Sequence, residues 1–159
     1  MKKPSLEEDP PNPSNSKALK MLCASIYLPK DDQSKPLGED AHFVCADQQA
    51  IGVADGVGGW ARHGVDAGEY ARELMLNSAI AVLRQHSPAG PAATIDPKSV
   101  LREAFSATRL PGSSTACVLA HSGGVLRAAN VGDSGFMLFR NLRLFYRSPT
   151  QQRGFNRPY

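Results

Sequence analysis

The stretch from Ile51 to Trp60, IGVADGVGGW, runs from an apolar segment directly into an aspartate and a cluster of glycines. The apolar residues before Asp55 predict a buried strand that ends at this carboxylate. The three glycines that follow leave the next turn almost without side chains. This pattern has two interpretations: an ordinary Asp-Gly turn, or a backbone that approaches a metal ion held by Asp55.

The residues before this stretch predict its partner strand. In DAHFVCAD, residues 40–47, the side chains alternate between two faces, and the pattern predicts a hairpin that turns at residues 47–49. The start of one strand then lies beside the end of the other, which brings Glu39 and Asp40 to the same sheet edge as Asp55. Carboxylates this close repel one another unless a cation lies between them, and such oxygen ligands suit Mg²⁺ or Mn²⁺. A solvated strand entrance is the alternative for Glu39 and Asp40.

The rest of the chain predicts an α+β fold. A strand is expected at residues 19–28 and a helix at residues 66–86, with Asp66 as its N-cap. A second, shorter helix should begin at Asp96-Pro97 and stop near Pro111 and Gly112, and it carries the apolar residues Val100, Leu101, Ala104 and Phe105. From Ser114 onward, apolar runs alternate with SGG, GDSG and RN, as in consecutive antiparallel strands. Strands, then helices, then strands indicate antiparallel sheets covered by helices.

Composition excludes several classes of function. The length of 159 residues fits one domain, and no apolar run is long enough to span a membrane. The net charge of +3 has no basic stripe interleaved with aromatic residues, which argues against nucleic-acid binding. Three widely spaced cysteines fit reduced core thiols of an intracellular protein. Residues 1–18 are expected to be a disordered leader, because they contain no apolar region typical of a signal peptide, and Glu7, Glu8 and Asp9 argue against a transit peptide.

Four motifs resemble a known family. GEDAHF, IGVADGVGGW, GSSTACVLA and LRAANVGDSGFMLFR occur in the order and approximate spacing of the metal-dependent protein phosphatases of type 2C, and look most similar to a subgroup common in plants. The resemblance implies an antiparallel β-sandwich flanked by helices. Residues 19–159 would be the N-terminal part of such a phosphatase domain, incomplete at the C-terminus, because the later acids of the family do not occur in the sequence.

The resemblance also implies roles for the acidic residues. Asp55 would bridge two Mg²⁺ or Mn²⁺ ions, and the Gly56 carbonyl would bind one of them. Glu39 and Asp40 would hold metal-bound waters, and Asp133 lies where the family can support a third ion. Metal-activated water would then hydrolyse phosphoserine or phosphothreonine in a phosphoprotein substrate.

Two positions depart from the better-known family pattern. Lys35 stands four residues before Glu39, where many members use Arg to bind substrate phosphate; Lys supplies the charge but not the bidentate fork. A solvated surface lysine is the alternative for this position. Val57 stands directly after Asp-Gly, where a His in many members can protonate the leaving group. In GSST, residues 112–115, the hydroxyl side chains are expected to bond backbone in a turn.

Two other functions are compatible with parts of the sequence. GDSG with Ser134 suggests a trypsin-like serine protease, but that mechanism needs a histidine oriented by an acid, and no segment with that pattern precedes the motif. GDSG could also be only a hairpin loop. The more serious alternative is a catalytically inactive, truncated phosphatase-like protein with a binding or regulatory role. Without the later acids, we expect little hydrolysis by the 159-residue chain alone.

Overall fold

A computed structural model describes residues 19–33, 35–85, 94–154 and 157–158 of the chain. The predicted leader at residues 1–18 lies outside the described residues. The main element is a four-stranded antiparallel sheet of order β1-β2-β3-β4. Its strands are β1 (Asp40–Cys45), β2 (Ala50–Asp55), β3 (Ala116–Ser122) and β4 (Val125–Val131).

The predicted hairpin at the start of the sheet is confirmed. β1 and β2 are antiparallel, with Cys45 opposite Ala50 at the turn and Asp40 opposite Asp55 at the other end. Phe43 is buried and its neighbours His42 and Val44 are exposed, as the alternation of the sequence requires. This register is what brings two carboxylates to one edge of the sheet.

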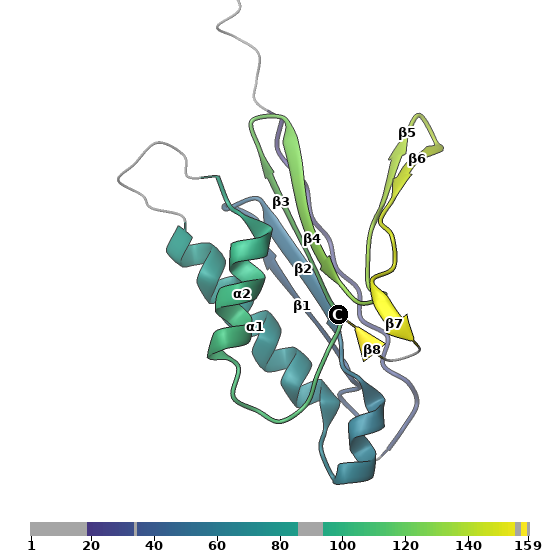
Figure 1. Cartoon of the computed structure of the whole chain (residues 1–159). Coiled ribbons are helices and arrows are strands. Elements are labelled where there is room, and N and C mark those ends of the chain that lie inside the picture. The colour runs from purple at the N-terminus through teal and green to yellow at the C-terminus, as the bar shows by residue number, and fades with distance from the viewer. Residues whose placement is uncertain (1–18, 34, 86–93, 155–156, 159) are drawn as a thin grey trace, which may run out of the picture.

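Two helices cover one face of the sheet (Figure 1). α1 (Ala67–Gln85) packs against β1 and β2, and α2 (Pro97–Ala107) packs against β3 and β4. The largest fully buried side chains, Met75, Val82, Val100 and Val118, lie in the core that these elements share. Asp66 accepts a hydrogen bond from the Gly68 backbone N–H at 2.8 Å, so its predicted role at the start of α1 is confirmed.

The remaining elements are short. A 3₁₀ helix, η2 (Gly58–His63), follows β2, and two small antiparallel sheets are formed by β5 (Met137–Arg140) with β6 (Arg143–Arg147) and by β7 (Gln152–Gly154) with β8 (Arg157–Pro158). β4 and β5 lie in different sheets, so GDSG is not a hairpin loop. The predicted α+β class, with helices covering antiparallel strands, is confirmed.

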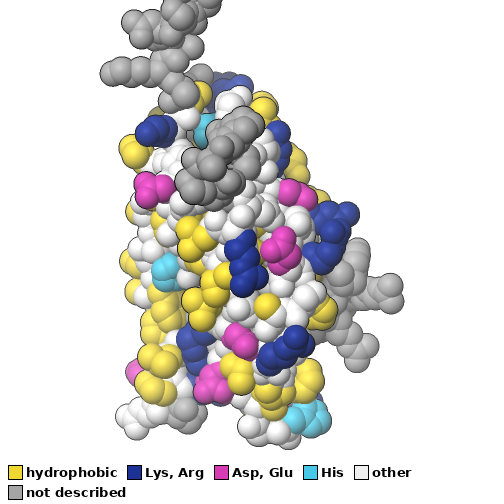
Figure 2. Space-filling model, turned by 90° about the vertical axis from the view of Figure 1, so that its left-hand side faces the viewer, with side chains coloured by type: hydrophobic (Ala, Val, Ile, Leu, Met, Phe, Trp, Pro, Cys, Tyr) yellow, Lys and Arg dark blue, Asp and Glu magenta, His cyan; other side chains and the backbone are white. Residues whose placement is uncertain are grey.

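The helical face carries charges of both signs. Figure 2 shows acidic and basic side chains interspersed over this face, without a patch of one sign. Apolar side chains are exposed among them, including Leu76 and Leu83 of α1. None of the helices within the described residues is long and apolar enough to cross a membrane.

The prediction of a strand at residues 19–28 is wrong. The structure assigns no regular secondary structure to this segment. Side chains link it to the hairpin: the Met21 N–H donates to Gln49 Oε1, and Ser25 Oγ lies 3.0 Å from His42 Nε2. Leu22 is 97% exposed and Ile26 is 83% exposed. The apolar pattern alone therefore does not produce a strand here, because these side chains find no surface to cover them.

The start of the second helix is confirmed, but its predicted end is wrong. The helix stops at Ala107, because Thr108 takes an extended backbone conformation. The next two N–H groups, those of Arg109 and Leu110, donate to Glu73 Oε2 at 3.0 and 2.8 Å. A carboxylate from α1 thus replaces the helical carbonyl acceptors. Of the apolar residues that the helix was expected to carry, Val100 and Ala104 are buried and Phe105 is 68% exposed.

We expect Asp96→Ala to lower the free energy of unfolding by about 1 kcal/mol, the usual cost of losing an N-cap. The Asp96 side chain accepts a hydrogen bond from the Lys98 N–H at 3.2 Å, and Pro97 begins the helix. Urea unfolding monitored by circular dichroism measures the change. Asp96→Asn is the matched control, because it keeps an accepting oxygen and should unfold close to the wild type. Equal midpoints for Asp96→Ala and wild type would contradict the cap.

Candidate functional site

Two carboxylates meet at the open end of the first hairpin. Asp40 and Asp55 are partners in the register of β1 and β2. The pKa of Asp55 is raised, first by partial desolvation and then by the charge of Asp40 and a hydrogen bond with it. The charge of Asp133 also raises this pKa, whereas Lys30 lowers it. Ionisation of both carboxylates is therefore unfavourable, and a cation beside them would reduce their repulsion.

Hydroxyl groups at the start of β3 hold the backbone of Asp55. The Asp55 N–H donates to Thr115 Oγ1 at 3.2 Å, and the Asp55 carbonyl accepts from Ser114 Oγ at 2.8 Å and from the Thr115 N–H at 2.9 Å. The prediction that the hydroxyl residues of GSST bond backbone is confirmed for Ser114 and Thr115, whereas Ser113 Oγ accepts a hydrogen bond from the Trp60 side-chain N–H at 2.8 Å. These contacts fix the direction in which the Asp55 side chain leaves the sheet.

Thr115 has a second role that sequence reasoning missed. Its Oγ1 lies 2.5 Å from Ser134 Oγ, and the side chain is buried, with 5% of the residue exposed. Thr115 thus connects Asp55 to the loop that carries Asp133. The only signal in the sequence was the run of hydroxyl residues in GSST, which does not identify a partner 19 residues away.

Gly56 is buried and packed against backbone on two sides. Its N–H donates to the Glu39 carbonyl at 2.9 Å. A Cβ at this position would clash with the Ala67 carbonyl group and lie 2.8 Å from the Glu39 carbonyl oxygen. A glycine is required here because the start of α1 and the approach to β1 converge on it.

Lys35 and Glu39 form an ion pair beside the two aspartates. Lys35 Nζ lies 2.6 Å from Glu39 Oε1, and the side chains are 26% and 18% exposed. This hydrogen bond is the main reason why the pKa of Lys35 is raised. The Glu39 carboxylate therefore faces a lysine, while Asp40 and Asp55 face one another.

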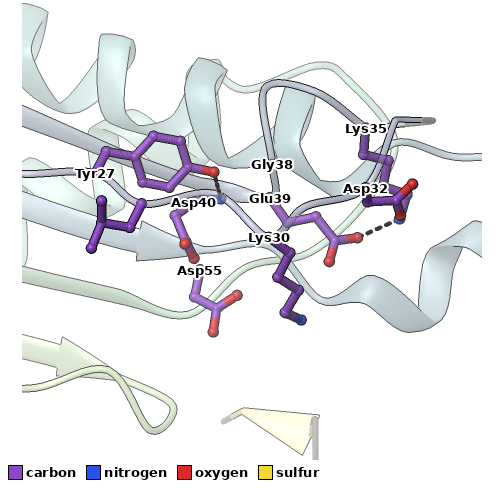
Figure 3. A pocket seen from close by; sticks show the side chains of 9 residues that line it. Tyr27, Lys30, Asp32, Lys35, Gly38, Glu39, Asp40 and Asp55 are labelled. Atoms are coloured by element: carbon purple, nitrogen blue, oxygen red, sulfur yellow. Dashed lines mark hydrogen bonds and ion pairs between the residues drawn. The ribbon is translucent and has the colours of Figure 1, made fainter.

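These residues line one cavity of about 320 Å³ (Figure 3). Glu39, Asp40, Asp55 and Lys35 all contribute, together with Tyr27, Leu28, Lys30, Asp32 and Gly38. Asp133 does not line this cavity; it lines a separate depression with Ser134 and Arg147. Within the described part of the chain, no three His, Cys, Asp or Glu residues lie close enough together to hold one metal ion. The carboxylates present can contribute one or two direct bonds to an ion, which leaves most of its coordination to water or other groups.

Comparison with known proteins finds close relatives. No family model matches the chain. The chain is 52% identical over 144 residues to "Probable protein phosphatase 2C 55" of Arabidopsis thaliana, covering 91% of this chain and 30% of the relative. It is 47% identical over 154 residues to "Probable protein phosphatase 2C 80" of the same plant, covering 96% of this chain and 36% of the relative. The chain thus spans about a third of the length of these two curated relatives.

A solved structure shares the fold. The X-ray structure of the photosystem II phosphatase PBCP superposes with a TM-score of 0.73 at 31% sequence identity. The match covers 83% of this chain and 51% of that chain. The fold and the sequence similarity therefore both confirm the predicted resemblance to the type 2C phosphatases.

Proposed function

Because the chain is homologous to the plant protein phosphatases 2C over most of its length, we propose that it forms part of a serine/threonine protein phosphatase. Its substrates are phosphoproteins that carry phosphoserine or phosphothreonine. The observation that carries this proposal is the contact between Asp40 and Asp55 at the open end of the hairpin, within a fold that a solved phosphatase shares.

The proposed cofactor is Mg²⁺ or Mn²⁺. The donor set supports this choice, because both ions accept a few carboxylate and carbonyl oxygens and keep several waters. Asp55 and the Gly56 carbonyl would hold the ion directly, Glu39 and Asp40 would act through water, and Asp133 would serve a weaker site. When bound, the metal lowers the pKa of water and neutralises charge on the phosphoryl oxygens.

The chain's own residues keep this donor set in place. Ser114 and Thr115 hold the Asp55 backbone, and the ion pair with Lys35 holds the Glu39 side chain. Lys35 also adds positive charge to a cavity that must receive a phosphoryl dianion. Val57 offers no acid for the leaving group, so water is the proton donor in this proposal.

An exchange experiment tests the function. The matching segment of Arabidopsis probable protein phosphatase 2C 55 is replaced by this chain, and the chimera, the unexchanged relative and the 159-residue chain alone are assayed on a phosphoserine peptide. We expect Mn²⁺-dependent hydrolysis by the chimera and little by the chain alone, since the chain spans 30% of the relative. An inert chimera beside an active relative would refute the proposal and favour the binding or regulatory alternative.

We expect Lys35→Ala to lower kcat/KM of the chimera by about 2- to 10-fold, because Lys35 acts through charge and through Glu39 rather than through a bidentate fork. Steady-state kinetics on the phosphoserine peptide measure the loss. Lys35→Arg is the control and should keep most of the activity. Unchanged kcat/KM for Lys35→Ala would contradict any role of this lysine in the reaction.

A further inference from the structure

The cavity beside Asp55 contains a second lysine whose charge is not neutralised by an ion pair. Within the described residues, the salt bridges join Lys35 to Glu39 and Arg72 to Asp66, and Lys30 takes part in neither. Lys30 nevertheless lines the same cavity as Asp40 and Asp55. Figure 3 shows its side chain extending between those of Glu39 and Asp55. The ammonium group of Lys30 is therefore available to a ligand, whereas that of Lys35 is already engaged.

The backbone around Lys30 is held by local hydrogen bonds. The Asp32 N–H donates to the Lys30 carbonyl at 2.8 Å, the Lys35 N–H donates to the Asp32 carbonyl at 3.0 Å, and the Gly38 N–H donates to the Lys35 carbonyl at 2.8 Å. Tyr27 closes the segment, because its hydroxyl donates to the Leu37 carbonyl at 2.8 Å. This series of turns presents Lys30 to the cavity from a defined position.

The charge balance of the cavity indicates what Lys30 can bind. Four carboxylates line it, those of Asp32, Glu39, Asp40 and Asp55, so a bare anion would be repelled. An anion is admitted only where cations offset these charges. Lys30 supplies such a cation, since it lines the cavity and takes part in neither ion pair of the described residues, so an anionic group can bind where it contacts this ammonium.

We propose that Lys30 is a substrate-binding residue whose ammonium group binds the phosphoryl oxygens of a phosphoserine or phosphothreonine peptide in this cavity. This inference rests on the proposed phosphatase function and adds a residue to it. Lysine binds phosphate as a point charge, through charge-assisted hydrogen bonds. Lys35 then mainly positions Glu39, and Lys30 attracts the substrate.

Two measurements test Lys30 separately from catalysis. Fluorescence anisotropy gives the Kd of a labelled phosphoserine peptide for the 159-residue chain and for the chimera, and steady-state kinetics give kcat and KM of the chimera. We expect Lys30→Ala to raise both Kd and KM by about 5- to 10-fold, with kcat changed less than about 2-fold, as for a lost charge-assisted contact to the substrate. Lys30→Arg should restore binding.

A matched control isolates the position of the charge. Lys98 is an exposed lysine on α2 outside the cavity, so Lys98→Ala changes the net charge equally and should leave Kd and KM unchanged. Equal Kd values for wild type and Lys30→Ala overturn the inference, as does equal binding of the unphosphorylated peptide or no binding by either protein. An inert chimera that loses phosphopeptide binding on Lys30→Ala supports Lys30 as a phosphate ligand while the proposed function fails.

Discussion

Asp55→Asn should abolish Mn²⁺ binding and lower the Mn²⁺-dependent activity of the chimera by at least about 100-fold, because the carboxylate is the proposed direct ligand of the ion. The wild-type chain should bind Mn²⁺ with a dissociation constant on the order of 100 µM or weaker, since few carboxylates contact the ion directly. Isothermal titration calorimetry measures the binding, and phosphopeptide hydrolysis measures the activity.

The control for this variant is Asp47→Asn, which removes an exposed carboxylate from the β1–β2 turn at the opposite end of the hairpin. It should leave Mn²⁺ binding and activity unchanged. If wild type and Asp55→Asn bind Mn²⁺ equally, Asp55 is not a metal ligand, and the proposed cofactor site must lie elsewhere.

The raised pKa of Asp55 also predicts the direction in which Asp55→Asn changes the stability of the fold. The pKa of Asp55 is raised, so the folded state holds this proton more tightly than the unfolded chain does. The resulting stability is fully present below the ordinary pKa of an aspartate and is lost as the pH rises through the raised pKa. At pH 7 the ionised pair with Asp40 therefore costs stability in the absence of metal. We expect metal-free Asp55→Asn to melt at the same temperature as wild type or higher, and a lower melting temperature would indicate a structural role instead.

The sequence predicted those features that depend on local patterns. The alternation of residues 40–47 sets which face each side chain occupies, and a slip of one residue would expose Phe43, so the register that pairs Asp40 with Asp55 follows from it. The start of α2 follows in the same way from Asp96 and Pro97, whose chemistry acts within one turn.

Apart from the strand expected at residues 19–28, the features that the sequence did not predict involve partners that are distant in the sequence. The end of α2 depends on Glu73, whose carboxylate accepts a hydrogen bond from the N–H of Arg109, 36 residues later in the chain. The link between Asp55 and the GDSG loop passes through Thr115 and Ser134. The sequence did not identify Lys30 as a candidate site residue, because a lysine among polar residues has the pattern of any solvated surface lysine. Only the structure places it in the lining of a cavity. Propensity and periodicity do not encode such contacts, since they arise when separate elements pack.

Packing around Gly56 gives the second large expected effect. Gly56 lacks a side chain because backbone from two elements closes on it, and this holds whether or not a metal binds. A Cβ at Gly56 would lie 2.7 Å from the Ala67 carbonyl carbon and 2.8 Å from the Glu39 carbonyl oxygen. Neither atom belongs to a flexible side chain, so the start of α1 or the entry to β1 must shift to make room.

We therefore expect Gly56→Ala to lower the free energy of unfolding by about 1–3 kcal/mol, the usual cost of overpacking, and to weaken Mn²⁺ binding by moving Glu39 and Asp55 apart. Urea unfolding and calorimetry measure the two effects. Gly59→Ala is the matched control, because its Cβ would meet no atom closer than Val57 Cγ1 at 4.0 Å, and its stability should stay close to that of wild type. If Gly56→Ala and Gly59→Ala are equally stable and bind Mn²⁺ equally, the convergence of backbone at Gly56 does not constrain the site. A loss confined to Gly56→Ala would show that the DG step in IGVADGVGGW is required by packing, and that the same packing holds Asp55 beside Asp40.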